Sequence, residues 1–462
     1  MTDRDTAIGC AKATISDGSF LKTLEERIAI RSESQDPAQR PAIMHYLQAQ
    51  IIPQLERMGF THQIHENPLP HGAPILTAAR IEAEDLETVL FYGHGDVQPG
   101  REEKWRDGLS PWQLKVEGER VYGRGTADNK GQHSMVLAAL ETVLATRGRL
   151  GFNAKFFLEM SEEIGSPGIG EFVDAHRALL AADCFIGCDG PRSVPDLPAL
   201  RLGSRGYKAF SLNVDLRDGS RHSGHWGGIL KDAGLILAQA LSSLADRNGK
   251  ILVADWLPNS VDPRARKLLE TVPFDSSAAD AGWGEPGLTT LEKICLWTSF
   301  SVTAFLTGNP EKPGSEVQGH ARALCNIRYT VDVSEEDLLP ALERHLQAHG
   351  FSEVKVQVER NGTGVLPSRT DPEDPWVGFC AGSITATLGK TPTILPNGSG
   401  TLPSCYFQNY LEIPVIWIPL SYPGCGQHGP NEHMLTSLFD EGISLMTGLI
   451  WDIGQRNAKS AQ

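Results

Sequence analysis

The chain has 462 residues, of which 40% are apolar and 21% charged, a composition typical of a globular protein with more than one domain. Acidic residues outnumber basic ones by 57 to 42, and this excess argues against nucleic acid or an anionic membrane as the main partner. No apolar run approaches the ~18–20 residues of a membrane helix, and the first residues lack the pattern of a signal peptide. The eight cysteines form no C-x-x-C pair, so we expect reduced thiols and a cytoplasmic protein.

The first half of the chain predicts alternating helices and strands. Apolar residues at helical spacing predict two helices within 19–59, and strand-like runs follow at 75–81 and 87–92. The second strand leads into Gly93-His94-Gly95-Asp96, so His94 and Asp96 are expected at its carboxyl end, where open α/β sheets bind ligands. A histidine beside an aspartate there suits a metal ligand with an orienting carboxylate, although a polar turn would look the same.

Two further motifs repeat this pattern. Asp128 lies in a glycine-flanked turn (123–131) before a helix predicted over 132–146, where it could also be a simple N-cap. Glu162 and Glu163 follow a buried strand at 154–160, a position that favours a site over a solvated face, and Asp189 follows a strand at 184–188. Repetition at successive strand ends predicts one shared site.

The middle of the chain reads as an inserted α+β unit. Its predicted strands cover 204–215, 321–331 and 354–359, its helices 229–245 and 334–349, and residues 255–315 are expected to be irregular. Alternation then resumes, with a helix at 375–388, a strand at 413–418, the histidine His433 and a closing helix at 435–455. We therefore expect an α/β domain in two parts, 1–204 and 372–462, interrupted by a domain at 205–371.

The strand-end side chains supply two imidazoles and several carboxylates. Five of them would give two metal ions three protein ligands each if one carboxylate bridged. With an activated water between the ions, this arrangement suits a hydrolytic centre, and zinc is the metal we expect. The remaining glutamate would take the water's proton. The chain contains no H-E-x-x-H, P-loop or G-x-S-x-G motif, and its Gly-Arg-Gly stretch lacks the spacing of a dinucleotide-binding fold.

Four motifs together resemble the M20 metallopeptidases, a family that includes carnosinase-like and other dipeptidases and amino-acid deacylases. They are Gly93–Pro99, Gly123–Gly131, Glu162-Glu163 and Asn431-Glu432-His433, and the likeness covers nearly the whole chain in the right order. The resemblance implies a zinc-exopeptidase-type α/β catalytic domain with an inserted α+β lid domain that mediates homodimerisation. It also implies two zinc ions per subunit, for which manganese or cobalt could substitute.

Carried onto matching positions, the resemblance makes Asp128 the ligand that bridges the two ions. His94 and Asp189 would hold one ion, and Glu163 and His433 the other. Glu162 would be the general base and Asp96 the residue that orients His94. The resemblance further implies a cis peptide bond between Asp128 and Asn129.

The resemblance also suggests residues that bind substrate. His222, in the turn His222-Ser223-Gly224, would reach into the partner subunit's site and polarise the scissile carbonyl, and Arg328 would grip the substrate carboxylate. Either could instead be a surface residue of a turn or a strand edge. Gly400 and Thr401 align with the loop that binds the carboxylate end.

Two positions depart from the family pattern. Asn397-Gly398 stands where carnosinase-like members carry Arg-Glu, and Ser315 stands where an asparagine is common. Both departures concern the carboxylate-binding half of the site. Asp189, in contrast, is the form more frequent in the family's aminopeptidases and dipeptidases.

The sequence therefore predicts a zinc-dependent hydrolase that cleaves the amide bond of a dipeptide or similar small molecule. The alternative is an N-acyl-amino-acid deacylase, which a lid-facing pocket without an amine-binding carboxylate would favour. An inactive metal-binding scaffold fits less well, because the base and all five expected ligands are present. We expect a small peptide or N-acyl amino acid as substrate, and neither nucleic acid nor a membrane as partner.

Overall fold

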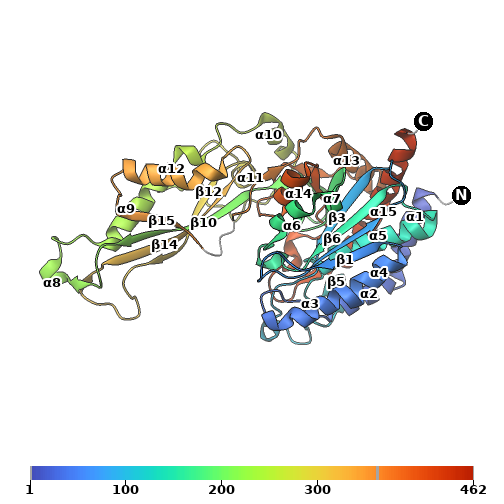
Figure 1. Cartoon of the computed structure of the whole chain (residues 1–462), viewed down its shortest axis with the longest axis horizontal. Helices are drawn as coiled ribbons and strands as arrows, with labels where there is room; N and C mark the ends of the chain where they lie inside the picture. The colour runs from blue at the N-terminus through green and yellow to red at the C-terminus, as the bar shows by residue number, and fades with distance from the viewer. Residues whose placement is uncertain (1–2, 360–363, 461–462) are drawn as a thin grey trace.

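The computed structural model describes residues 3–359 and 364–460. Figure 1 shows an α/β body on one side and a narrower body of strands and helices extending from it. The α/β body is built on an eight-stranded sheet in the order β1-β2-β6-β3-β7-β18-β8-β17. Its strands are β1 (Thr61–His65), β2 (Ile75–Arg80), β3 (Thr88–His94), β6 (Asn153–Glu159), β7 (Cys184–Gly187), β8 (Ala199–Arg201), β17 (Thr393–Leu395) and β18 (Val415–Trp417).

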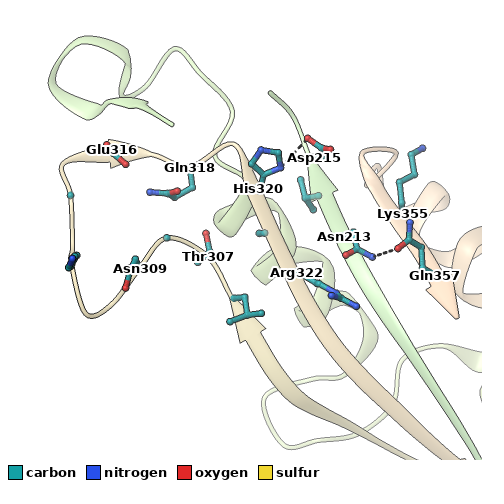
Figure 2. A pocket seen from close by; sticks show the side chains of 16 residues that line it. Asn213, Asp215, Thr307, Asn309, Glu316, Gln318, His320, Arg322, Lys355 and Gln357 are labelled. Carbon is teal, nitrogen blue, oxygen red and sulfur yellow. Dashed lines mark hydrogen bonds and ion pairs between the residues drawn. The ribbon is translucent and has the colours of Figure 1, made fainter. Parts of the chain in front are cut away.

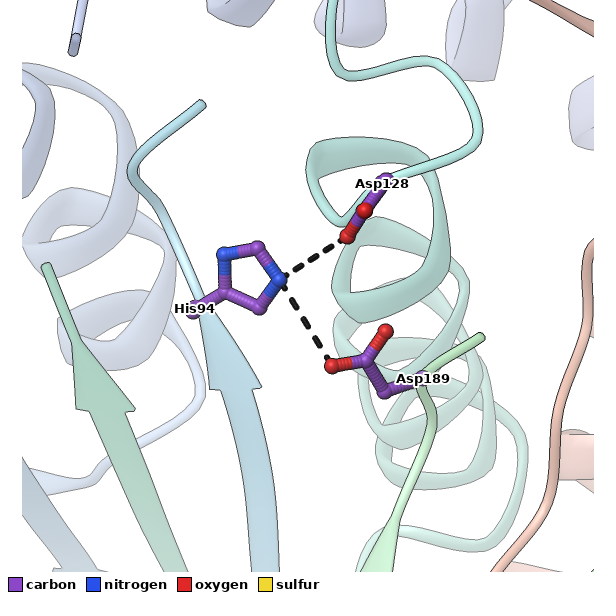
Figure 3. Close-up of side chains that lie close together, drawn as sticks. All are labelled: His94, Asp128 and Asp189. Carbon is purple, nitrogen blue, oxygen red and sulfur yellow. Dashed lines mark hydrogen bonds and ion pairs between the residues drawn. The ribbon is translucent and has the colours of Figure 1, made fainter. Parts of the chain in front are cut away.

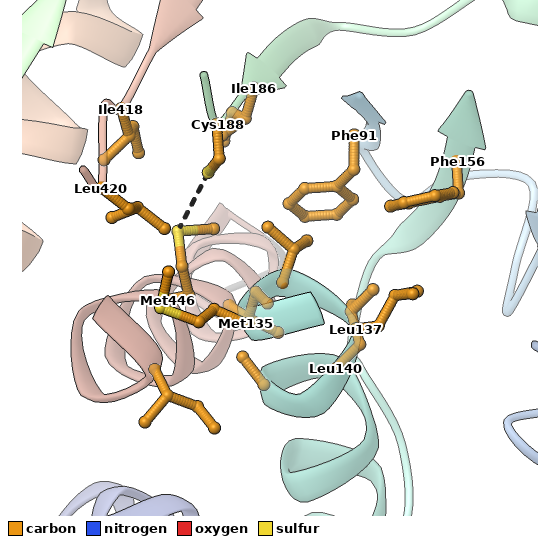
Figure 4. Close-up of a cluster of buried hydrophobic side chains, with 14 of the residues drawn as sticks. Phe91, Met135, Leu137, Leu140, Phe156, Ile186, Cys188, Ile418, Leu420 and Met446 are labelled. Carbon is orange, nitrogen blue, oxygen red and sulfur yellow. Dashed lines mark hydrogen bonds between the residues drawn. The ribbon is translucent and has the colours of Figure 1, made fainter. Parts of the chain in front are cut away.

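The middle of this sheet is buried on both faces. Along β3, Val89 and Phe91 join one hydrophobic core, whereas Leu90 and Tyr92 join the core on the other face. Because successive side chains of a strand point to opposite faces, a strand covered on both sides must be apolar throughout. Figure 4 shows Phe91 and Phe156 of neighbouring strands facing side chains of the helices beneath them.

Helices cover the two faces of the sheet in two groups. One group supplies the first core, and comprises α1 (Arg4–Ser16), α2 (Ser19–Ile28), α3 (Arg40–Tyr46), α4 (Ile52–Arg57), α5 (Lys130–Arg147), α13 (Pro375–Leu388) and α15 (Thr436–Ser460). The other covers the opposite face with α6 (Ile169–Ala175), α7 (Arg177–Leu180) and α14 (Ser404–Leu411). No helix within the described residues combines the length and hydrophobicity needed to cross a membrane.

The second body has its own antiparallel sheet and core. The sheet order is β12-β14-β10-β15, with β10 (Gly206–Asp215), β12 (Ser299–Leu306), β14 (His320–Tyr329) and β15 (Val354–Val358). Alternate residues of β10, such as Phe210 and Leu212, pack on α9 (Ala233–Leu244) and α12 (Glu335–Ala348). The chain enters and leaves this unit beside the short antiparallel pair β9 (Gly203–Ser204) and β16 (Ser368–Arg369). The predicted α/β fold with an inserted α+β unit is confirmed.

The interpretation of residues 255–315 as irregular was wrong. They contain α10 (Pro263–Leu269), α11 (Thr290–Cys295) and β12, which pairs with β14. Along β12, Phe300, Val302 and Ala304 alternate with polar residues, but this short run was overlooked within a Pro/Gly-rich stretch. β12 is an edge strand, and its side chains are mostly exposed. The helices α1 and α14 and the strand β1 were likewise not predicted from the sequence.

Candidate metal centre

The polar residues predicted to share a site follow neighbouring strands. β3 ends at His94 and pairs in parallel with both β6 and β7. Glu162 comes three residues after the end of β6, and Asp189 comes two residues after β7. Because the carboxyl ends of parallel strands meet at one edge of the sheet, these side chains converge there.

A first group of possible ligands consists of His94, Asp128 and Asp189. The Nε2 atom of His94 lies 3.0 Å from Oδ1 of Asp128 and 3.6 Å from Oδ2 of Asp189. Figure 3 shows the imidazole of His94 facing both carboxylates. One ligand atom from each residue lies within 4.8 Å of the other two, and all three side chains are buried. This spacing allows one small cation to contact all three.

A second group is formed by Asp128, Glu163 and His428. The Nε2 atom of His428 lies 3.0 Å from Oδ2 of Asp128 and 3.2 Å from Oε2 of Glu163. Asp128 thus directs one oxygen to each group. Gln98 donates a hydrogen bond from Nε2 to the same Glu163 oxygen at 2.9 Å.

His433, which was expected to join Glu163, lies outside both groups. It begins β19 (His433–Leu435), where it pairs with Tyr122 of β5 (Arg120–Tyr122). Its Nε2 atom lies 2.6 Å from the hydroxyl of Tyr422, and its Nδ1 atom lies 2.9 Å from the carbonyl of Asn431. Both ring nitrogens therefore already have partners in the protein.

His428 was not predicted from the sequence because it lies in the irregular segment before β19, where no periodicity indicates the direction of a side chain. The backbone is left-handed at His428 (φ 62°) and Asn431 (φ 59°), so the chain reverses between them. Glu432, which directly precedes His433, was the available signal. A glutamate buried in a polar loop needs hydrogen-bond donors. The position of those donors determines which part of the loop lies over Asp128.

The turn that carries Asp128 is held by Glu432. One carboxylate oxygen of Glu432 accepts hydrogen bonds from the backbone N–H groups of Gly125 (3.1 Å), Ala127 (2.9 Å) and Asp128 (3.1 Å). The other oxygen accepts one from Nη1 of Arg124 at 2.5 Å. The peptide bond between Asp128 and Asn129 is cis, as predicted.

Asp96 and Glu162 lie beside the first group. An oxygen of Asp96 lies 3.3 Å from Nδ1 of His94, and the carboxylate accepts hydrogen bonds from the N–H groups of Glu162 (3.2 Å) and Glu163 (3.1 Å). Asp96 therefore links the histidine to the turn that bears both glutamates. Oε2 of Glu162 lies 3.9 Å from Nε2 of His94.

The crowding of acidic groups changes their protonation. Burial, reinforced by the charge of Asp128, raises the pKa of Asp189 to about 6. Burial likewise raises the pKa of Glu162 and of Glu163 well above the ordinary value. For Asp128 burial acts in the same direction, but the hydrogen bonds from His428 and His94 outweigh it and lower the pKa.

Clustered, buried carboxylates with two imidazoles form a donor set that requires positive charge. Divalent cations that accept nitrogen and oxygen ligands, such as zinc, would supply it. The residues present therefore fit the implied metal ions.

A cavity of about 490 Å³ opens beside the second group. It is lined by residues of both bodies, among them Gln98, Glu162, Glu163, Tyr207, Asn326, Arg328, Thr401, Tyr406 and His428. Nη1 of Arg328 donates a hydrogen bond to the hydroxyl of Thr401 at 2.7 Å, and its guanidinium lies over the ring of Tyr207, 5.1 Å from the centroid. The neighbouring Gly400 is exposed.

The structure does not bring His222 to this cavity. His222 is exposed and caps the short helix α8 (Ser223–Trp226), which Figure 1 places at the end of the inserted unit farthest from the α/β body. The backbone N–H of Ser223 donates to the carbonyl of Ser315 at 2.7 Å, so Ser315 supports this turn.

Comparison with known proteins agrees with this geometry. The pattern of peptidase family M20/M25/M40 matches residues 90–452. The chain is 26% identical to a Beta-Ala-His dipeptidase of Rattus norvegicus, covering 94% of this chain and 93% of the relative. It is 28% identical to a Cysteinylglycine-S-conjugate dipeptidase of Corynebacterium striatum, over 76% of this chain and 77% of the relative.

The crystal structure of human carnosine dipeptidase 1 superposes with a TM-score of 0.77 at 25% identity, covering 98% of this chain and 99% of that one. The match of the family pattern extends through both parts of the α/β body and the inserted unit between them. The chain belongs to peptidase family M20/M25/M40.

Proposed function

We propose that the protein is a metal-dependent dipeptidase. The observation that carries this proposal is the position of Asp128, whose two carboxylate oxygens face separate groups of possible ligands. His94 and Asp189 complete one group, and Glu163 and His428 complete the other. The dipeptidases among its relatives, which match over most of their length, support the same reaction.

In this proposal each subunit holds two zinc ions, for which manganese or cobalt could substitute. When bound, the ions would activate a water molecule and polarise the scissile carbonyl. Glu162, beside the first group and bordering the cavity, accepts the water's proton and passes it to the leaving amine. Asp96 holds His94 in position, and Arg328 with the 400–401 loop binds the substrate's carboxylate.

The test is hydrolysis of a panel of dipeptides and N-acyl amino acids, before and after chelation, with zinc, manganese or cobalt added back. Cleavage of dipeptides that is lost on chelation and restored by metal supports the proposal. Dipeptide cleavage that resists complete removal of metal would refute it.

One observation favours deacylation as a second candidate. The carboxylates that line the cavity are Glu162 and Glu163, both beside the proposed metal positions, so no separate acid faces a substrate amine among the described lining residues. A free amino group would then contact the metal-site acids or a group from a partner subunit. In the same panel, exclusive cleavage of N-acyl amino acids would select the deacylase.

We further propose that the inserted unit is a lid through which two copies form a homodimer. Exposed apolar side chains on α8, β12 and the following segments support this, namely Trp226, Ile229, Leu235, Val302, Phe305 and Leu306. At the same end, a cavity of about 740 Å³ lies between β10, β14 and the segment before β14, and Figure 2 shows its polar lining of Asn213, Asp215, Glu316 and His320. His222, remote from its own subunit's cavity, would act in the partner's site.

The proposed division of the chain stays at 1–204, 205–371 and 372–462. It is supported by the separate hydrophobic core of the inserted unit and by the β9–β16 pair, where the chain enters and leaves that unit. A cytoplasmic location is proposed from the eight free cysteines, seven of which are buried.

A further inference from the structure

Arg205 is a buried arginine at the junction of the two bodies. Only 5% of its surface is exposed, and it lies between β9 and β10. Among the described residues its guanidinium contacts backbone carbonyls and one hydroxyl, and forms no ion pair with an acidic group. A buried charge without a counter-ion is costly, so a residue kept there calls for an explanation.

The hydrogen bonds of Arg205 meet the loop that borders the substrate cavity. Nε and Nη2 both donate to the carbonyl of Ser399, at 3.3 and 3.0 Å. Nη1 donates to the carbonyl of Trp297 at 3.3 Å and to the hydroxyl of Ser299 at 3.1 Å, where β12 begins. One side chain thus joins the 399–401 loop of the catalytic body to the lid sheet.

The backbone of Arg205 acts on the same loop. The hydroxyl of Thr401 donates its single proton to the carbonyl of Arg205 at 3.2 Å. The lone pairs of that hydroxyl then face Arg328, whose Nη1 donates to it at 2.7 Å. Arg205 therefore fixes both the loop and the orientation of the hydroxyl that holds Arg328.

We propose that Arg205 is a positioning residue of the carboxylate subsite, which presents Thr401 and Arg328 to the carboxylate of a substrate. This inference rests on the proposed function, since it assumes a substrate with a free carboxylate. Arg205 and Arg328 lie close enough to repel one another, and neither forms an ion pair with an acid in the described structure. An anion bound at the loop would relieve this repulsion.

The test compares Arg205→Met and Arg205→Lys with the unaltered protein. For each, kcat and KM are measured with a cleaved dipeptide, and the inhibition constant is measured for the same dipeptide carrying a C-terminal amide. In Arg205→Met we expect KM for the free-carboxylate dipeptide to rise about tenfold, as on losing a hydrogen bond to a charged group. The kcat should change less than about threefold, and the amide's inhibition constant should stay unchanged, because the altered contacts concern the carboxylate. KM of Arg205→Lys for the free-carboxylate dipeptide should lie between the values of Arg205→Met and the unaltered protein, since an ammonium replaces only part of the hydrogen bonds of the guanidinium.

The control is Arg27→Met. Arg27 is equally buried, at 1% exposure, and its guanidinium donates to Ser134 and Gln54 among the helices of the catalytic body. This variant reports the general effect of removing a buried arginine. It should change KM for the free-carboxylate dipeptide and the inhibition constant of the amide by the same factor. If Arg205→Met also changed KM and the amide's inhibition constant by the same factor, or changed neither of them, the positioning role would be overturned.

A second readout does not depend on turnover. Backbone amides of 399–402 should exchange hydrogen for deuterium faster in Arg205→Met than in the unaltered protein, whereas those of α5 should not change. Unchanged exchange in the loop would overturn the proposal whatever substrate is cleaved. If the unaltered protein cleaved no dipeptide, the proposed function would fail, and the exchange measurement would still decide the role of Arg205.

Discussion

The imidazole of His428 lies 3.0 Å from one carboxylate oxygen of Asp128, while the imidazole of His94 lies 3.0 Å from the other. Asp128 is thereby placed between two imidazole nitrogens, each of which has a further carboxylate beside it. A single bridging carboxylate of this kind is the feature that would make two metal ions one catalytic unit.

Replacing the two loop histidines separates their roles. His428→Ala should lower the affinity of the second metal position by more than about 100-fold, because it removes one of three protein ligands. His433→Ala should leave two ions bound, since both ring nitrogens of His433 bond to protein groups. Metal content after dialysis, measured by elemental analysis, checks this. Loss of metal from His433→Ala alone would restore the assignment made from sequence.

The adjacent glutamates form a natural pair of control variants. Glu162→Gln should retain both metal ions and lower kcat by on the order of 10²–10⁴, because it removes the group that accepts the water's proton. Glu163→Gln should instead lose metal from the position shared with His428. Turnover and metal content are measured on both proteins. Full activity in Glu162→Gln would remove it as the base.

Glu432 should matter for stability as well as for the position of Asp128. Its carboxylate is fully buried with Arg124, and both side chains are 1% exposed. Glu432→Gln leaves the guanidinium without its counter-ion, which should lower the free energy of unfolding by ~3–5 kcal/mol. Denaturant unfolding of the metal-free protein measures the loss. A change below about 1 kcal/mol would show that the carbonyls of Pro99 and Gly429, which also accept from Arg124, suffice.

Glu159 predicts a pH dependence of stability in the metal-free protein. Burial raises the pKa of Glu159 from its ordinary 4.5 to about 8, against the hydrogen bond that it accepts from Tyr92. The native state therefore holds a proton that the unfolded chain releases. The resulting stability is fully present below about pH 4.5 and is lost as the pH rises towards 8, by up to ~1.4 kcal/mol per unit.

Glu159→Gln mimics the protonated side chain and should remove this contribution. Thermal unfolding of both metal-free proteins from pH 5 to pH 9 isolates the effect, because the other acidic groups remain in each. The difference in stability between variant and unaltered protein should grow with pH until about pH 8. A constant difference would mean that Glu159 is ionised in the native state.

His222 tests the role of a second copy. If it acts in the partner's site, His222→Ala should depress kcat strongly with metal content unchanged, because His222 lies far from both ligand groups of its own chain. Mixing His222→Ala with Glu162→Gln should restore part of the activity, since each mixed dimer then contains one intact site. Activity that stays at the level of the separate variants would contradict the shared site.

Most residues of the candidate centre could be predicted from the sequence because they follow strands. Once β3, β6 and β7 are recognised as parallel neighbours, His94, Asp189 and the glutamate pair must converge. His428 could not be found in this way, since its position depends on the hydrogen bonds that Glu432 makes across the chain to the turn of Asp128.

The edge strand β12 carried only a short signal, because Phe300, Val302 and Ala304 alternate with polar residues but Phe305 ends the alternation. Arg205 gave no local signal. Its importance arises only when Ser399 and Thr401, almost 200 residues away in the chain, fold against it.

The most direct test of the two-metal account is a titration of the metal-free protein with zinc, following dipeptide hydrolysis and locating the ions by anomalous diffraction. Activity should rise to a plateau at about two ions per chain, as a two-metal site requires. One ion should lie between His94, Asp128 and Asp189 and the other between Asp128, Glu163 and His428. Full activity with a single ion, or a second ion bound away from His428, would contradict the account.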